Sequence, residues 1–149
     1  MISQLEPFNF HTTIQLRWKD IDQFGHVNNA VYLTYFETAR YYYNRDVNQW
    51  DWDQDQYIIA AIHIDYLRPI FYPGDIQVYL RVTEVGYKSF VFHYAITTKK
   101  NGIEKIAAVG KSTQVMYHLP TQRTIPIPER LIAQWQFFEK PEHFTTESA

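Results

Sequence analysis

The sequence contains no cysteine at any of its 149 positions. Disulfide bonds, zinc sites built from thiolates and cysteine nucleophiles are therefore excluded. Long apolar runs are missing too, since none approaches the ~18 residues of a membrane span. The first residues have neither the basic nor the apolar stretch of a secretory signal. These absences lead us to expect a soluble cytoplasmic protein.

Runs of basic charge and several catalytic motifs are also absent. No basic run exceeds two residues and the net charge is −2, so nothing indicates a nucleic-acid footprint. The chain has no Gly-x-Ser-x-Gly elbow, which argues against an α/β-hydrolase, and no glycine-rich phosphate loop. No His, Asp and Glu residues stand at metal-ligand spacing, so we expect neither a metal nor another cofactor.

Aromatic side chains are abundant instead. They make up 17% of the chain, with twelve Tyr and ten Phe, and 46% of all residues are hydrophobic. A chain of this length forms one ordinary domain, so we expect a single domain over residues 1–149. The aromatic share suggests broad sheet faces, an aromatic-lined pocket or a subunit interface.

Hydrophobic periodicity predicts the order strand, long helix, four strands, short helix. Alternation over residues 11–18 predicts the first strand. A helical period over residues 30–45, with Asn28 or Asn29 as the N-cap, predicts a mostly buried helix. Further strands are expected at 57–67, 76–84, 89–98 and 103–117, and a short helix at about 129–138. The polar tail from Pro141 is expected to fray.

This order predicts an α+β architecture, in which a curved antiparallel sheet wraps around one long helix. The continuous apolar run of residues 58–62 is typical of a strand covered on both faces. The Asn101-Gly102 pair predicts a tight hairpin, because it tolerates positive φ at both central positions. Two layers alone would leave the helix partly uncovered, so we expect at least a dimer.

The segment from Asp20 to Asn29 concentrates polar side chains just before the predicted helix. It contains two carboxylates, a glycine turn, a histidine and two asparagines. A helix N-terminus offers unpaired N–H groups and a partial positive charge. A carboxylate beside such a terminus forms a candidate acyl-transfer site.

The stretch 17–29, Arg-Trp-Lys-Asp-Ile-Asp-Gln-Phe-Gly-His-Val-Asn-Asn, resembles the signature of the 4-hydroxybenzoyl-CoA thioesterase family, which has the hotdog fold. The segments 64–69, 72–75 and 86–90 also fit, and the resemblance covers about residues 10–120. It implies an acyl-CoA thioesterase. An acyl-ACP thioesterase, which needs acyl carrier protein as partner, is the close alternative. A non-catalytic acyl-thioester-binding module is the third reading.

The resemblance also implies roles for residues of this segment. Asp22 becomes the catalytic carboxylate, as nucleophile or as general base. The backbone N–H of Asn29 becomes the donor that polarises the thioester carbonyl, although one bacterial branch has His at that position. His26 is expected to assist. Asp20 is expected to be structural, as a turn former or as the partner of Arg17 or Lys19.

Substrate contacts are expected from Asn28, from Tyr32 in the acyl pocket, and from basic or polar groups that meet the CoA phosphates. The candidates for the CoA contacts are Arg68, Lys88 and Ser89, because they lie at the ends of predicted strands. Each of them is explained equally well as an ordinary surface residue. The resemblance places the active site between subunits of a homodimer or homotetramer. Glu37 is interpreted as a buried structural hydrogen-bonding residue, and His63 as a core or interface residue.

Overall fold

The structure is a computed structural model that describes residues 3–139 and 145–146. The tail predicted to fray from Pro141 therefore lies mostly outside the described residues. The long elements are β1 (Phe10–Gln15), α1 (Val31–Asp46), β2 (Tyr57–Tyr66), β3 (Asp75–Val85), β4 (Ser89–Lys100), β5 (Ile103–His118) and α2 (Glu129–Phe138). The short ones are η1 (Ser3–Leu5), η2 (Trp18–Asp20), β6 (Arg123–Thr124) and β7 (Thr145–Thr146).

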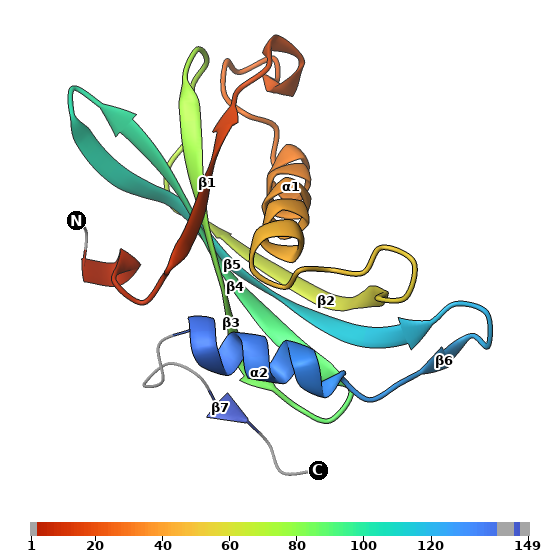
Figure 1. The fold of residues 1–149 in the computed structure, drawn as a ribbon. Coiled ribbons are helices and arrows are strands. Elements are labelled where there is room, and N and C mark those ends of the chain that lie inside the picture. Colours follow the sequence, from red (N-terminus) through yellow and green to blue (C-terminus); the bar gives the residue numbers. More distant parts are fainter. Residues whose placement is uncertain (1–2, 140–144, 147–149) are drawn as a thin grey trace.

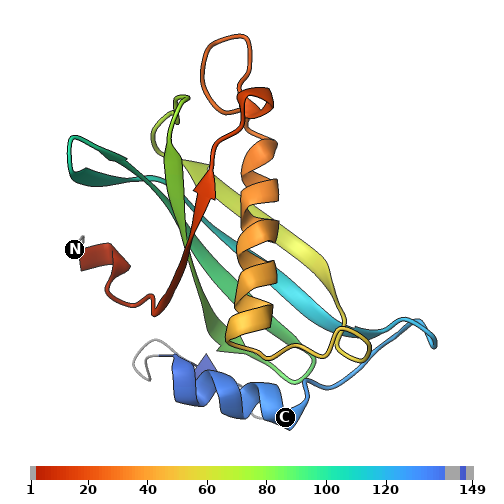
Figure 2. The same cartoon turned by 45° about the horizontal axis from the view of Figure 1, so that its top comes forward.

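The main sheet has the strand order β1-β3-β4-β5-β2, and every pair along this path is antiparallel. The sheet curls around α1, which lies along its concave face (Figure 1). Figure 2 shows the N-terminal end of α1 beside the loop that precedes it, at the end of the sheet where β1 stops. The predicted α+β arrangement is confirmed.

The core lies between α1 and the concave face of the sheet. The ring of Phe36 on α1 stacks on Tyr94 of β4, with ring centroids 4.0 Å apart. This close approach depends on Gly110 of β5, where a Cβ atom would come within 2.9 Å of the Phe36 ring and 2.7 Å of the His63 carbonyl oxygen. The aromatic content is thus largely used in packing, because Tyr35, Tyr43, Phe90 and Phe92 are also buried here.

The first strand is shorter than predicted. β1 ends at Gln15, and residues 18–20 form a turn of 3-10 helix instead of continuing the strand. The physical reason is Asp20, whose buried carboxylate accepts hydrogen bonds from the backbone N–H and guanidinium of Arg17 and so pulls the chain into a turn. Trp18 consequently points to solvent, 74% exposed.

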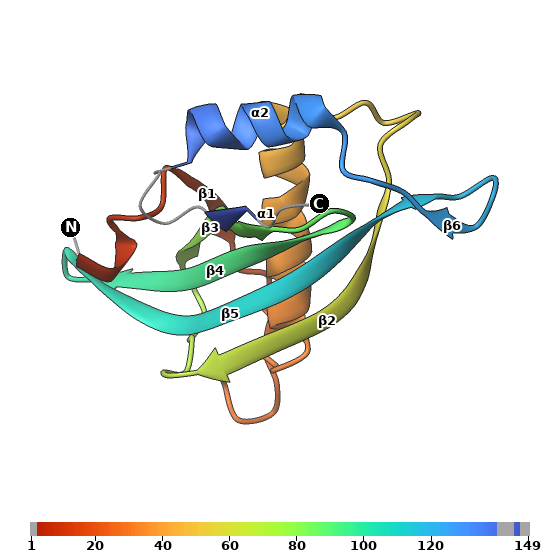
Figure 3. The ribbon, with the colours of Figure 1, turned by 90° about the horizontal axis from the view of Figure 1, so that it is seen from below.

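The prediction that residues 58–62 are covered on both faces is wrong for one copy of the chain. β2 is an edge strand that pairs only with β5, at the border of the sheet (Figure 3). Ile58, Ile59 and Ile62 are each at least 40% exposed. The apolar run therefore marks a surface that this copy leaves open.

The far end of the sheet is closed by α2, which occupies the range predicted for the short helix. Trp135 is fully buried there, and its Nε1–H donates to Asn48 Oδ1 at 2.6 Å. The predicted hairpin is confirmed, because Asn101 and Gly102 both adopt positive φ. No helix among residues 3–139 is long and apolar enough to span a bilayer.

Candidate active site

The loop between β1 and α1 folds into a closed turn around Asp22. The Asp22 N–H donates to the His26 carbonyl oxygen at 2.9 Å, and the Gly25 N–H donates to the Asp22 carbonyl oxygen at 3.1 Å. Gly25 has a φ of +86°, a backbone conformation that favours glycine. The loop is also tied to the chain after β2, because Val27 N–H donates to Ile70 O at 2.8 Å. The turn is therefore held at both ends.

The Asp22 carboxylate lies at this turn. One of its oxygens accepts a backbone hydrogen bond, and the other faces His26 at a longer distance. Its Oδ1 accepts the Phe24 N–H at 2.8 Å. Its Oδ2 lies 3.5 Å from Nδ1 of His26, with the two side chains 20% and 33% exposed. The structure thus brings together Asp22 and His26, two of the three residues predicted to be catalytic. A partly exposed carboxylate beside an imidazole can accept a proton from water or attack an electrophile.

The Asp20 carboxylate is buried, and both of its oxygens accept hydrogen bonds. It accepts from Arg17 through N, Nε and Nη2, and from the Tyr35 hydroxyl at 2.8 Å. Burial alone would raise the pKa of Asp20, but the hydrogen bonds from Arg17 and Tyr35 outweigh it and lower that pKa. The predicted partnership with Arg17 is confirmed, and Asp20 anchors the loop to the first turns of α1.

The start of α1 differs in detail from the prediction. Ala30 occupies the N-cap position, whereas Asn28 makes a turn just before it. Asn28 Oδ1 accepts the Ala30 N–H at 2.9 Å, and Asn28 O accepts the Val31 N–H at 3.0 Å. Within the described residues the Asn29 N–H has no hydrogen-bond partner. That donor is free at the position where the resemblance places carbonyl polarisation.

Tyr66 holds the other side of Asn29, a contact that the sequence analysis did not predict. Its hydroxyl donates to the Asn29 carbonyl oxygen at 2.9 Å. Its ring meets Tyr32 edge-on, with centroids 4.9 Å apart. Burial, with a smaller effect of Tyr66, raises the pKa of Tyr32 to about 12, so Tyr32 stays neutral. The strand alternation that puts Tyr66 on the same face as Ile64 was the available signal.

Exposed aromatic rings border His26. Phe24 stacks beside the imidazole at 6.2 Å, and Phe71 meets it edge-on at 6.3 Å. Phe24 is 73% exposed and Phe71 is 60% exposed. These rings form an exposed apolar border around His26. The sequence analysis did not predict this border, because Phe71 is distant from His26 in sequence.

The three groups predicted to meet CoA do not gather at this loop within one chain. Lys88 and Ser89 lie where β4 begins, opposite Val115, at the far end of the sheet from Asp22. The Lys88 ammonium donates to Thr124 Oγ1 at 3.2 Å. Arg68 follows β2 at the near end, but its side chain lines a groove on the outer face of the sheet.

The prediction that Glu37 is buried is wrong, and His63 is not a core residue in one copy of the chain, so its predicted interface role stays a prediction. Glu37 is exposed on α1, and within the described residues its carboxylate makes no hydrogen bond, because it projects away from the core that its neighbour Phe36 fills. His63 is exposed on β2, with Nε2 3.0 Å from Asp65 Oδ1. Among residues 3–139, no three His, Asp or Glu side chains are grouped so as to hold a metal ion.

The family model of the thioesterase-like superfamily matches residues 16–135, which include the whole loop and α1. The chain belongs to this superfamily. The resemblance to hotdog thioesterases is thereby confirmed, and with it the hotdog fold, since the curled sheet around α1 matches solved thioesterase structures. The superfamily does not by itself specify which carbonyl compound a member acts on.

Individual relatives within the thioesterase-like superfamily are distant. YsmA of Bacillus subtilis, an uncharacterized protein, is 31% identical over 88 residues, which span 58% of this chain and only 60% of YsmA. FadM of Escherichia coli, a long-chain acyl-CoA thioesterase, is 28% identical over 123 residues, 80% of this chain and 92% of FadM. A Thermus thermophilus thioesterase, solved with coenzyme A and zinc, is 31% identical with a TM-score of 0.78, and the match covers 91% of this chain and 99% of that one.

Proposed function

We propose that this protein is an acyl-CoA thioesterase, which hydrolyses an acyl-CoA thioester to the free acid and CoA. The observation that carries the proposal is the Asp22 carboxylate, which is partly exposed in a braced loop at the start of α1. Membership of the thioesterase-like superfamily and the similarity to FadM support it. The CoA-bound Thermus thermophilus relative supports CoA as the carrier.

In the proposed reaction, Asp22 either removes a proton from the attacking water or attacks the thioester carbonyl itself. The carbonyl oxygen gains negative charge in the tetrahedral transition state. The Asn29 N–H, unpaired in the described residues and backed by the helix start, is the donor we assign to that oxygen. His26 steadies Asp22 Oδ2 from 3.5 Å. Collapse of the tetrahedral species expels CoA as its thiolate, which takes up a proton to give the thiol. Where Asp22 is the nucleophile, the acyl group remains on it as a mixed anhydride, which water then hydrolyses to release the acid and restore the carboxylate.

The proposed enzyme works as a homodimer, or as a tetramer built from such dimers, with the exposed edge of β2 as the contact. A two-fold axis makes the paired edges run antiparallel. The Tyr57 end of one β2 then lies beside the Tyr66 end of the other. Ser89 and Lys88 are at the Tyr57 end of the sheet, so a second copy would carry them toward the Asp22 loop. Their predicted contact with CoA phosphates is therefore proposed in trans, with Arg68 and Asn28 from the near end.

The test is a panel of acyl-CoA substrates of different chain length, both aliphatic and aromatic, with release of thiol as the readout. The proposal expects turnover on at least one acyl-CoA. Faster turnover on the matching acyl-ACP would instead favour the carrier-protein alternative. Saturable binding of acyl-CoA in calorimetry without thiol release would replace the enzyme by a binding module. The cytoplasmic location expected from the sequence belongs to this proposal, since acyl-CoA is found there.

A further inference from the structure

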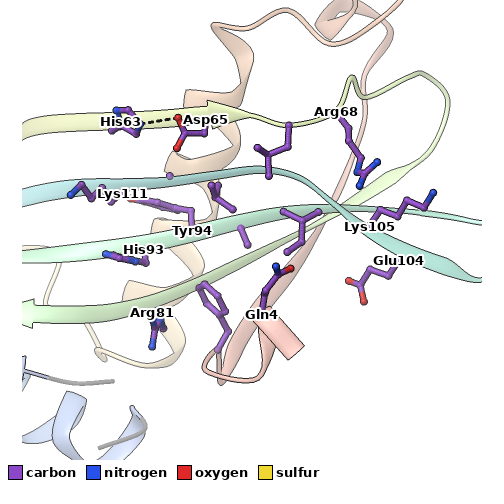
Figure 4. A pocket seen from close by; sticks show the side chains of 16 residues that line it. Gln4, His63, Asp65, Arg68, Arg81, His93, Tyr94, Glu104, Lys105 and Lys111 are labelled. Atoms are coloured by element: carbon purple, nitrogen blue, oxygen red, sulfur yellow. Dashed lines mark hydrogen bonds and ion pairs between the residues drawn. The ribbon is translucent and has the colours of Figure 1, made fainter. Parts of the chain in front are cut away.

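Four basic side chains form a row across the outer face of the sheet, the face opposite α1. Arg81 on β3 pairs with His93 on β4, His93 pairs with Lys111 on β5, and Lys111 pairs with His63 on β2. Figure 4 shows these four side chains at one end of the groove that the outer face carries. Directly opposed side chains of a sheet are about 5 Å apart. Burial lowers the pKa of His93, so Arg81 and Lys111 carry the permanent charge of the row. We call this set the basic row.

Basic side chains outnumber carboxylates in the groove, which is lined by two arginines and two lysines but only by Asp65 and Glu104 among the acidic residues. Outside this lining, Glu84 attracts His93 and Glu139 attracts Arg81. Asp65 contacts His63, at one end of the row. Glu104, also in the groove, accepts from the Tyr79 and Thr97 hydroxyls at 2.9 and 2.7 Å. Glu139, which lies near Arg81, accepts from the Val82 N–H and the Tyr43 hydroxyl. The groove therefore carries excess positive charge in a chain whose net charge is −2.

Several buried nitrogen atoms of the basic row, among them two donors of Arg81, have no hydrogen-bond partner in the described part of the chain. These atoms are Nε and Nη1 of Arg81 and Nε2 of His93. The Phe8 ring covers Arg81, with the guanidinium carbon 5.2 Å from the ring centroid. A buried unpaired donor costs about 1–3 kcal/mol, more when it is charged. An anion over the row would reduce that cost.

The groove beside the basic row has an apolar floor. The next register row contains Ala95 and Val109 as direct neighbours, and Ile106 and Phe8 border them. The groove has a volume of about 920 Å³, within the range of small-molecule sites. Arg68 and Lys105 lie at the opposite end from the basic row (Figure 4). The groove thus offers cationic side chains to a charged group of a ligand and an apolar surface to the rest of it.

We propose that this groove binds a small molecule that carries one or two phosphate groups, with a phosphate over the basic row and an apolar or planar body on Ala95 and Val109. A phosphate offers several acceptor oxygens and two negative charges, which suits a row of donors better than a single carboxylate. A second copy is a poorer occupant. A two-fold axis through the basic row would lay the row of one copy against that of the other.

The test is calorimetry on the full chain with orthophosphate, pyrophosphate, ADP and adenosine. We expect saturable binding of the phosphate compounds, tightest for ADP, and none for adenosine. Lys111→Gln, an exposed position that should not affect folding, is expected to weaken binding roughly tenfold, the scale of a charge-assisted hydrogen bond. Arg81→Gln should do the same, with thermal unfolding recorded to confirm that it folds.

Arg123→Gln is the matched control, because Arg123 is exposed on β6, at the other end of the sheet, and the charge change is the same. It should leave binding unchanged. The proposal is overturned if no phosphate compound binds at millimolar concentration, or if Lys111→Gln binds like the wild type. A change of oligomeric state in Lys111→Gln without phosphate binding would also overturn it, in favour of a subunit contact. Asp22→Asn should bind normally, so the outcome is independent of the proposed hydrolysis.

Discussion

Asp20 and Asp22 are separated by one residue, yet they lie in opposite environments. The side chain of Asp20 is 1% exposed and is surrounded by donors from Arg17 and Tyr35. Asp22 is 20% exposed and has an oxygen directed toward His26. A carboxylate that is fully hydrogen-bonded is poorly placed to react, whereas one at an open turn is accessible to substrate. The physical setting therefore explains a stabilising role for Asp20 and leaves Asp22 accessible for the chemistry proposed for it.

The role of Asp20 predicts a pH-dependent loss of stability when it is replaced. Its folded pKa lies below the ordinary value of 3.8, so the ionised form stabilises the fold. That contribution is complete above 3.8 and is lost as the pH falls through the lower, folded pKa. Asp20→Asn should lower the free energy of unfolding by about 2 kcal/mol at neutral pH, the scale of hydrogen bonds to a charged group. Urea unfolding should show this difference shrink as the pH falls below 3.8.

Asp46→Asn is the control for this measurement, because Asp46 makes an exposed pair with Arg45. Exposed pairs contribute little to stability. Equal urea midpoints for Asp20→Asn and the wild type at neutral pH would show that Asp20 is not the anchor of the loop.

At the scale of secondary-structure elements, β2 combines two properties that rarely occur together on a free surface. It is a ten-residue edge strand with an unpaired backbone edge, and it exposes Ile58, Ile59 and Ile62. Exposed apolar edges are liable to pair with another chain unless charges or bulges protect them. The proposed dimer uses this edge.

The β2 edge predicts that a charge placed on it separates the subunits. Ile62→Lys would bury a lysine at the contact twice, once from each copy. Loss of about 1.5 kcal/mol at each symmetric position should raise the dimer dissociation constant on the order of 100-fold. Sedimentation equilibrium measures this, and hydrolysis should fall with it because the proposed site draws on residues of both copies.

Ile103→Lys is the matched control. Ile103 is 60% exposed at the start of β5, at the hairpin and away from the β2 edge. It should leave the dimer intact. A wild-type chain that sediments as a monomer at all concentrations would contradict the proposed contact.

Over the whole molecule, local sequence signals predicted local structure well. Periodicity located α1 to within one residue at each end, and Asn101-Gly102 located its hairpin. The end of β1 was missed because alternation continues through Trp18, whereas the hydrogen bonds of Asp20 with Arg17 and with the distant Tyr35 hold the chain in a turn.

Features that depend on register or on a second copy were not predictable from one sequence. The basic row joins four strands whose residues are 12 or more positions apart, and no single strand reveals it. Tyr66 reaches Asn29 across 37 positions. The placement of Lys88 and Ser89 at a CoA site depends on how two copies meet, which periodicity does not encode. Asp22 itself came from a local motif, and so it could be named from the sequence.

The most direct test of the account is the steady-state rate of thiol release by Asp22→Asn on the best acyl-CoA of the panel. Asp53→Asn is the control, since Asp53 is exposed in the loop after α1. We predict that Asp22→Asn lowers kcat/KM on the order of 10²-fold or more, while its thermal unfolding and the activity of Asp53→Asn stay unchanged. Substantial turnover by Asp22→Asn, equal to that of the wild type, would contradict the assignment of the chemistry to this loop.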